Sequence, residues 1–183
     1  MIELYPNVLK WGVDLRQGIV HRLDKPTSGL ILCAYEKDAY EKIKEKFASR
    51  TVIKKYYAYV ENSVQSAKGM IDAPIGVDPK NKSRNKVVPN GRESITRYEV
   101  VRREENFDQL DIELVTGRKH QIRTHLAYLG NPILNDTLYG ANNFSPLPSY
   151  AIALHCYTLE FQIDNKEYLY KSSIPKYLEN LNN

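Results

Sequence analysis

The feature that most constrains the fold is a short stretch near residue 112 in which apolar and acidic side chains alternate. Three aliphatic residues are separated by two acids in this stretch: Leu110, Asp111, Ile112, Glu113 and Leu114. Because successive side chains of a strand point to opposite faces of a sheet, the alternation predicts a strand with one buried and one solvated face. Strands of this kind are typical of antiparallel sheets, so we expect Gln109–Thr116 to lie in one.

The rest of the chain contains more strand-like segments than helical ones. Segments rich in β-branched, aromatic or apolar residues are expected to form strands: Ser28–Tyr35 (buried), Val52–Val60, Ser94–Arg103, Ala151–Ile163 and Lys166–Ser172. Helical spacing or a terminal glycine cap indicates helices, and a short helix is expected at the end: Glu36–Ser49, Lys119–Leu129 and Pro175–Leu181. Two segments without periodicity are expected to be loops: Asp78–Gly91, exposed and basic with a tight turn at Asn90–Gly91, and Asn131–Pro148.

Strands and helices do not alternate strictly along the chain, which argues against a repeated βαβ pattern. The expected fold class is therefore α+β, with a mostly antiparallel mixed sheet and flanking helices. The 183 residues contain no internal repeats, low-complexity tracts or linkers. They are enough for one ordinary core, so we expect a single domain over residues 1–183.

Several classes of protein are disfavoured by composition. No apolar stretch reaches the roughly 18 residues that a membrane span requires. The first residues, MIELYPNVLKW, carry an acid and a proline where a secretory signal peptide needs a basic patch and an apolar core. Cys33 and Cys156 each lie within an apolar run, which fits reduced thiols, with one long-range disulfide as the alternative. We therefore expect a cytoplasmic monomer that has no contact with a membrane.

Positive charge is concentrated in two stretches of the chain. Lys42–Lys55 and Lys80–Arg97 each contain six Lys or Arg residues and one Glu, although the net charge of the whole chain is only +4. Such local surpluses suggest a surface that binds polyanions and make nucleic acid the leading candidate partner. The alternative is an ordinary solvated face rich in lysine.

Metal and cofactor chemistry lacks its usual motifs. His120 and His125 are five residues apart, which on a helix places them on different faces, and no cysteine pair has zinc spacing. A glycine-rich phosphate loop and a G-x-S-x-G elbow are also missing. We expect neither a metal nor a cofactor.

Two dense polar clusters lie beside predicted strands. The first, HRLDKPTSG, covers His21–Gly29, and the second, TGRKHQIRTH, covers Thr116–His125. Polar clusters at strand ends are a common place for a functional site, because the sheet holds them rigidly. The alternatives are that Asp24 only caps a turn and that the second cluster is a basic surface helix.

Read together, the two clusters suggest a nucleophile with its supporting groups. A carboxylate such as Asp24, close to a guanidinium, is favoured in its ionised form and can attack carbon covalently. Tyrosines at positions 56, 57 and 59 of a predicted strand could stack on a base. Tyrosines are also good strand formers, which is the commoner reason for finding them there.

Four stretches closely resemble the signature motifs of the RluA-type RNA pseudouridine synthases. They read GIVHRLDKPTSGLIL, KKYYAYV, GRKHQIRTHLAYLGNPILNDTLYG and ALHCYTLEF, and the similarity runs from about Tyr5 to Leu178. The resemblance implies the pseudouridine synthase catalytic-domain fold and isomerisation of uridine in rRNA or tRNA to pseudouridine, without a cofactor.

The resemblance also implies roles for individual residues. Asp24 matches the catalytic nucleophile, Tyr56 matches the tyrosine that packs on the target base and is a candidate proton acceptor, and Arg118 matches the arginine that pairs with the nucleophile. The remaining motif residues are expected to bind the substrate: His21, Arg22, His120, Gln121, Ile122 and Arg123.

In one respect the chain departs from that family. Members usually carry an N-K-P-x-G strand region before the H-R-L-D motif and often an S4-like RNA-binding domain, whereas this chain starts 20 residues before His21. We therefore expect an N-terminally truncated catalytic domain, with a catalytically impaired RNA-binding remnant as the alternative function. An unrelated glycosyl-transfer enzyme would need a second carboxylate as general acid, and neither cluster supplies one.

Overall fold

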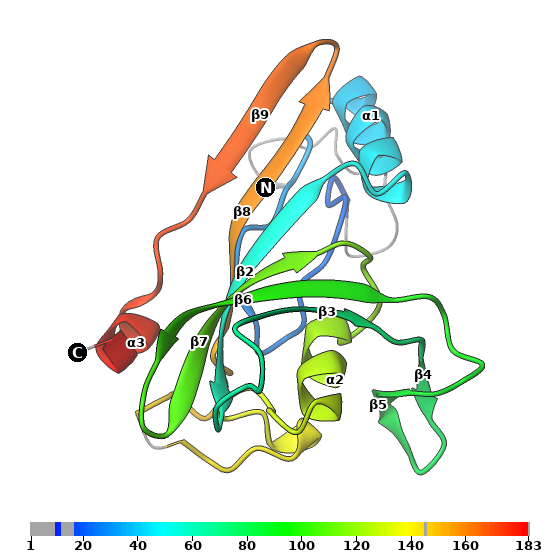
Figure 1. Ribbon diagram of the computed structural model, residues 1–183. Coiled ribbons are helices and arrows are strands. Elements are labelled where there is room, and N and C mark those ends of the chain that lie inside the picture. The colour runs from blue at the N-terminus through cyan, green and yellow to red at the C-terminus, as the bar shows by residue number, and fades with distance from the viewer. Residues whose placement is uncertain (1–9, 12–16, 145, 183) are drawn as a thin grey trace.

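A mixed, mostly antiparallel sheet forms the body of the molecule (Figure 1). The computed structural model describes residues 10–11, 17–144 and 146–182. The strands are β1 (Ser28–Gly29), β2 (Ile53–Glu61), β3 (Lys68–Asp72), β4 (Ile75–Asp78), β5 (Asn81–Val87), β6 (Ile95–Arg103), β7 (Phe107–Leu114), β8 (Leu154–Ile163) and β9 (Lys166–Lys171). The helices are α1 (Lys37–Ala48), α2 (Gln121–Tyr128) and α3 (Lys176–Glu179), with 3₁₀ turns η2 (Thr137–Tyr139) and η3 (Asn180–Asn182).

Seven strands form the main sheet, in the order β1-β8-β2-β7-β6-β3, with β9 also paired to β8. Among the strand pairings of this sheet in the described residues, only the short β1–β8 pairing is parallel. The central pair is β2 and β7, and the aliphatic residues Leu110 and Ile112 of β7 are completely buried. The α+β class, the mostly antiparallel sheet and the strand predicted around residue 112 are therefore confirmed.

Helix α2 packs on the sheet and is the helix that was predicted for the second cluster. Ile122, His125 and Leu126 turn into the core, and Gly130, with φ +85°, follows the helix end as expected. The helix begins at Gln121 rather than at residue 119, because His120 has a left-handed backbone with φ 55°. Helix α1 lies beside the far end of β8 (Figure 1), and it confirms the predicted amphipathic segment.

The prediction of a buried strand over Ser28–Tyr35 is wrong beyond its first two residues. Only Ser28 and Gly29 pair with β8, and the side chain of Ile31 is 45% exposed. The backbone N–H of Leu32 donates instead to the imidazole Nε2 of His21 at 2.9 Å. Further along, the segment makes only an isolated antiparallel bridge between Ile19 and Cys33, with the N–H of Ala34 donating to the carbonyl of Gly18 at 2.8 Å.

The prediction of a loop over Asp78–Gly91 is also wrong, because β4 and β5 form a hairpin there. The buried carboxylate of Asp78 accepts hydrogen bonds from the backbone N–H of Lys80 and from Nε of Arg84, which closes the turn. Polar contacts of this kind stabilise the hairpin without an apolar face. Its sequence therefore shows no apolar periodicity from which strands could be predicted. The predicted tight turn at Asn90–Gly91 is confirmed by a bond from the N–H of Gly91 to the carbonyl of Val88 at 3.0 Å.

The C-terminal elements follow the predictions. Strands β8 and β9 form the expected hairpin across Asp164 and Asn165, whose φ angles of 50° and 61° suit a tight turn. Helix α3 follows Pro175. Both cysteines are free, as expected for reduced thiols.

Among the residues that the structure describes, no helix is long and apolar enough to cross a membrane. The first nine residues, on which the expectation about a signal peptide mainly depends, lie outside the described residues.

Candidate active site

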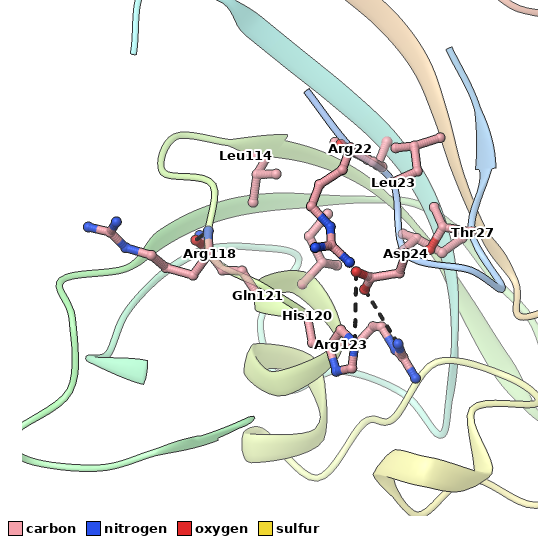
Figure 2. Close-up of a pocket in the computed structure, with 12 residues that line it drawn as sticks. Arg22, Leu23, Asp24, Thr27, Leu114, Arg118, His120, Gln121 and Arg123 are labelled. Atoms are coloured by element: carbon pink, nitrogen blue, oxygen red, sulfur yellow. Dashed lines mark hydrogen bonds and ion pairs between the residues drawn. The ribbon is translucent and has the colours of Figure 1, made fainter. Parts of the chain in front are cut away.

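The structure brings the two polar clusters together around one small pocket of about 60 Å³ (Figure 2). The pocket is lined by Arg22, Leu23, Asp24, Thr27, Tyr56, Leu114, Arg118, His120, Gln121, Ile122, Arg123 and Leu154. Five of these residues also line an adjoining, wider cleft of about 450 Å³, so the two spaces are continuous. Eight of the nine predicted site residues line the small pocket, and His21 lines only the wider cleft.

The loop before β1 places Asp24 at this pocket. Its carbonyl accepts the N–H of Thr27 at 2.9 Å, which closes a tight turn directly after the aspartate. Gly29 has φ +122°, and a Cβ built there would lie 2.3 Å from the carbonyl oxygen of Cys156. Only glycine fits this close approach, so the sequence T-S-G fixes where the loop joins the sheet.

Arg123 is the cation that faces Asp24. Its Nη1 lies 3.4 Å from Oδ2 of Asp24, while its Nε and Nη2 donate to Asp136 at 2.7 and 2.8 Å. Burial by itself lowers the pKa of Arg123, but the carboxylates of Asp136 and Asp24 more than compensate and raise it. The two-point anchor on Asp136 therefore fixes a positive charge beside Asp24.

Arg118 does not make the pairing with Asp24 that the resemblance implied. Although Arg118 lines the pocket, its guanidinium is directed away from Asp24 in Figure 2, and its Nε donates to the carbonyl of Glu93 at 3.1 Å. Arg118 lies before α2, and the left-handed residue His120 separates it from the helix. Arg123, on the helix itself, occupies the position expected of Arg118.

His120 lies between Asp24 and a tyrosine. Its Nε2 is 3.8 Å from Oδ1 of Asp24, and its Nδ1 is 3.0 Å from the hydroxyl of Tyr139. Burial lowers the pKa of His120, with Arg123 and Lys119 acting in the same direction and Asp24 opposing them. The imidazole is therefore mainly neutral at neutral pH.

Gln121 and Ile122 line the pocket but serve the scaffold. The amide oxygen of Gln121 accepts from the Thr116 hydroxyl at 2.7 Å and the Arg118 N–H at 3.0 Å. Its amide nitrogen donates to the carbonyl of Ile95 at 2.9 Å and also to Thr96. Since these bonds engage both ends of the amide, Gln121 holds the second cluster against β6 rather than facing outward. Ile122 is a core residue, 4% exposed.

Tyr56 is the tyrosine of β2 that reaches the site. It is buried, and burial together with the neighbouring Cys156 thiol raises the pKa of its phenol well above the usual value. Tyr57 points to the opposite face and stacks on Tyr157 at 4.0 Å between ring centroids, and Tyr59 is fully buried. Of the three tyrosines considered for base stacking, only Tyr56 lines the pocket.

His21 and Arg22 differ in their surroundings. His21 stacks on Phe47 at 4.7 Å and accepts the N–H of Leu32. Burial, with Lys54 nearby, lowers the pKa of His21 to about 4, so the ring is neutral and structural. Arg22 is exposed, and Figure 2 shows its guanidinium directed into the pocket, on the same side as Asp24.

Two residues of the site were missed by the motif analysis. Asp136 anchors Arg123, and Tyr139 contacts both His120 and, through its ring at 4.9 Å, the guanidinium of Arg123. Both lie in the NDTLYG stretch, which belongs to the resemblance but was expected only as loop. The sequence feature that could have identified them is an acid and a tyrosine shortly before a glycine, Gly140, whose φ is +97°.

Within the described ranges, no group of three or more His, Cys, Asp or Glu side chains is arranged to hold a metal ion. The groups that converge on the pocket are instead a carboxylate, a guanidinium, a neutral imidazole and a phenol.

Comparison with known proteins gives a consistent result. Residues 11–128 match the model of a family described as RNA pseudouridylate synthase. The uncharacterized RNA pseudouridine synthase YlyB of Bacillus subtilis is 40% identical over 126 residues, which are 69% of this chain and 42% of that protein. The dual-specificity RNA pseudouridine synthase RluA of Vibrio cholerae is 43% identical over 122 residues, 66% of this chain and 50% of that protein.

A solved structure agrees. Human RNA Pseudouridylate Synthase Domain Containing 1 is 25% identical and has a TM-score of 0.76, with 86% of this chain and 69% of that chain covered. The chain thus spans between 42% and 50% of the length of the two curated relatives above.

Proposed function

The chain belongs to the RNA pseudouridylate synthase family, and we propose that it converts uridine in structured RNA, either rRNA or tRNA, to pseudouridine. The observation that carries the proposal is the carboxylate of Asp24, directed into a pocket and facing the anchored guanidinium of Arg123. The names of two relatives support an RNA substrate: the dual-specificity RNA pseudouridine synthase RluA of Vibrio cholerae, and the ribosomal large subunit pseudouridine synthase D of Nitrosomonas europaea, which is 38% identical. We place the activity in the cytoplasm.

The proposed reaction needs a uridine that has left its base stack. Unstacking costs a few kcal/mol, which contacts between basic side chains and the phosphate backbone offset. Asp24 then attacks either C1′ of the ribose or C6 of the uracil, the bond between C1′ and N1 breaks, and the base turns. C5 bonds to C1′ as Asp24 leaves, C5 loses its proton, and N1 gains one. The product has the same composition as the substrate, so the scheme uses neither an oxidant nor a co-substrate.

The surroundings of Asp24 suit the role of nucleophile. The guanidinium of Arg123 lies 3.4 Å from its carboxylate, and the 14% exposure of the Asp24 side chain leaves it accessible from the pocket. We assign to Arg123 the pairing role that sequence resemblance had given to Arg118. Because burial raises the pKa of Tyr56, its phenol stays neutral in the free protein, which favours packing on the base over accepting a proton.

Basic side chains around the pocket offer a surface for the RNA backbone. Arg22, Arg50, Arg118 and Lys119 line the wider cleft. The β4–β5 hairpin adds three exposed lysines on the same side of the molecule as α2 (Figure 1): Lys80, Lys82 and Lys86. Contacts of this kind position a nucleic acid without reading its sequence.

The test uses the purified chain, rRNA and tRNA transcripts, and the variant Asp24→Asn. Asparagine keeps the shape of the side chain but removes the charged nucleophile. We expect the wild-type chain to form pseudouridine at a defined site and Asp24→Asn to form none while binding the same RNA. If both proteins bind RNA and neither forms pseudouridine, the chain is an RNA-binding protein without catalysis, and the proposal fails.

A further inference from the structure

The hydroxyl of Tyr139 is the meeting point of three other groups. The backbone N–H of Asn85 in β5 lies 2.9 Å from it, and the hydroxyl of Thr124 in α2 lies 3.2 Å from it. The third group is Nδ1 of His120 at 3.0 Å. Tyr139 itself is buried, with 9% of its surface exposed.

The directions of these bonds follow from which groups carry protons. A backbone N–H can only donate, so the phenol oxygen of Tyr139 accepts from Asn85, and it also accepts from the Thr124 hydroxyl. The phenol proton is then left for Nδ1 of His120, which must present a lone pair. If His120 donated instead, the oxygen would accept three bonds, because the geometry of the structure also has Thr124 donating, and the phenol proton would have no partner among these groups. The imidazole proton therefore lies on Nε2, the nitrogen that faces Asp24 at 3.8 Å.

We propose that Tyr139 is a positioning residue that fixes His120 in the neutral tautomer with its proton on Nε2, so that a neutral N–H faces the carboxylate of Asp24. The catalytic part of this inference rests on the proposed function, whereas the tautomer rests on geometry alone. The separation of 3.8 Å exceeds a hydrogen bond, and such contacts often shorten when substrate closes a site.

A neutral donor suits a nucleophile better than a second cation. A protonated His120 would compete with the reaction by binding the carboxylate that must attack. The charged groups near His120 oppose one another: Asp24 and Asp136 favour the protonated ring, whereas Arg123 and Lys119 disfavour it. Burial tips this balance toward the neutral ring, and the hydroxyl of Tyr139 then selects between the two neutral tautomers.

Nitrogen-15 NMR of the histidine rings tests the tautomer directly. The chain has only four histidines, and the signals of His120 are identified by their loss in His120→Gln. We expect the wild-type ring to carry its proton on Nε2. In Tyr139→Phe, which keeps the ring against Arg123, we expect the Nδ1-protonated or fully protonated form to appear. Tyr128→Phe is the matched control. Tyr128 lies in α2, the helix that follows His120, and is 62% exposed, so its replacement should leave the signals unchanged.

Kinetics test the catalytic consequence. Tyr139→Phe removes all three hydrogen bonds of the hydroxyl. Loss of the bond to His120 should lower kcat about fivefold to tenfold and leave the KM for RNA unchanged. His120→Gln, whose amide can still donate an N–H, should retain more activity than His120→Ala. Both replacements meet the same left-handed backbone, so strain cancels in the comparison.

Either of two results would overturn the inference. The first is a spectrum that contradicts the tautomer: either the wild-type His120 carries its proton on Nδ1, or Tyr139→Phe leaves the tautomer unchanged. The other is a raised KM with an intact kcat in Tyr139→Phe, since the hydroxyl would then serve only the β5 hairpin. If Tyr139→Phe fails to fold, the wild-type spectrum still decides the tautomer. A wild-type chain that forms no pseudouridine contradicts the proposed function, whereas the spectrum tests His120 independently.

Discussion

Arg123 and Asp24 lie 99 positions apart in the chain, yet the guanidinium Nη1 comes within 3.4 Å of the carboxylate Oδ2. The approach depends on Asp136, whose two oxygens bind the other two nitrogens of Arg123 and fix the plane of the guanidinium. Asp136 is 1% exposed, and its buried charge is paired with this guanidinium. The position of the cation beside Asp24 is therefore set by a residue that does not line the pocket.

Replacing Asp136 should disturb both stability and catalysis. In Asp136→Asn the amide N–H₂ faces the guanidinium, which leaves a buried charge partly unpaired. We expect a loss of about 3 kcal/mol in the free energy of unfolding, measured with urea. We also expect kcat to fall by about tenfold to a hundredfold, because Arg123 is no longer held in place.

The matched control is Asp164→Asn in the β8–β9 turn, where asparagine tolerates the left-handed backbone and Asp164 pairs with Lys42 at the surface. That change should cost less than about 1 kcal/mol. Equal costs at positions 136 and 164 would contradict the idea that the buried pair organises the site.

Gly29 should not tolerate a side chain. A Cβ there would lie 2.3 Å from the carbonyl oxygen and 2.5 Å from the nitrogen of Cys156, both fixed backbone atoms, and φ is +122°. Gly29→Ala should therefore move the Asp24 loop, lower the melting temperature and abolish uridine isomerisation. Gly117→Ala is the control for stability, because a Cβ at Gly117 meets nothing within 4 Å. Similar melting temperatures for the two variants would rule out the close approach at Gly29.

The stability of the protein should depend on His21 below neutral pH. Burial lowers the pKa of His21 to about 4 in the folded chain, against about 6.5 when unfolded. Between these values the unfolded chain binds a proton that the folded chain does not, so acid favours unfolding. The effect of His21 on the free energy of unfolding is nearly zero above about pH 7. At pH 5 it lowers that free energy by about 2 kcal/mol.

His21→Gln isolates this effect, because glutamine can still accept the N–H of Leu32 but does not titrate. From pH 7.5 to pH 5 the wild-type chain should lose about 2 kcal/mol more unfolding free energy than His21→Gln, measured with urea. Parallel pH profiles for the two proteins would show that His21 is not buried as a neutral ring.

The strands with strong alternation could be predicted, whereas the details of the site could not. Burial of Leu110 and Ile112 follows from period two in the sequence. The resemblance assigned the pairing with Asp24 to Arg118, and only the folded chain brings Arg123 beside that carboxylate. The left-handed backbone of His120 likewise leaves no trace in hydrophobic periodicity. Asp136 lies in a segment without periodicity, and its partner is known only once the chain is folded. Long-range polar pairs of this kind are invisible to local patterns.

The β4–β5 hairpin should contribute to RNA binding through charge alone. Its lysines at positions 80, 82 and 86 are exposed, while Asn85 and Arg84 tie the hairpin to residues 138 and 139 beside the site. Replacing the three lysines with glutamine should weaken RNA binding equally for all sequences. The slope of log K against log salt should become shallower by about two, since each lost phosphate contact removes about 0.7 to 0.9.

A second triple variant separates local from overall charge. Lysines 166, 171 and 176 are also exposed, but they lie on β9 and α3, away from the hairpin in Figure 1. Their replacement with glutamine removes the same net charge and should leave the salt slope nearly unchanged, because exposed charges beyond about 10 Å are screened at 0.1 M salt. Equal changes in slope for the two triple variants would mean that RNA responds to overall charge and not to the hairpin. A loss of kcat without a loss of affinity in the hairpin variant would instead assign the hairpin to the chemistry of the site.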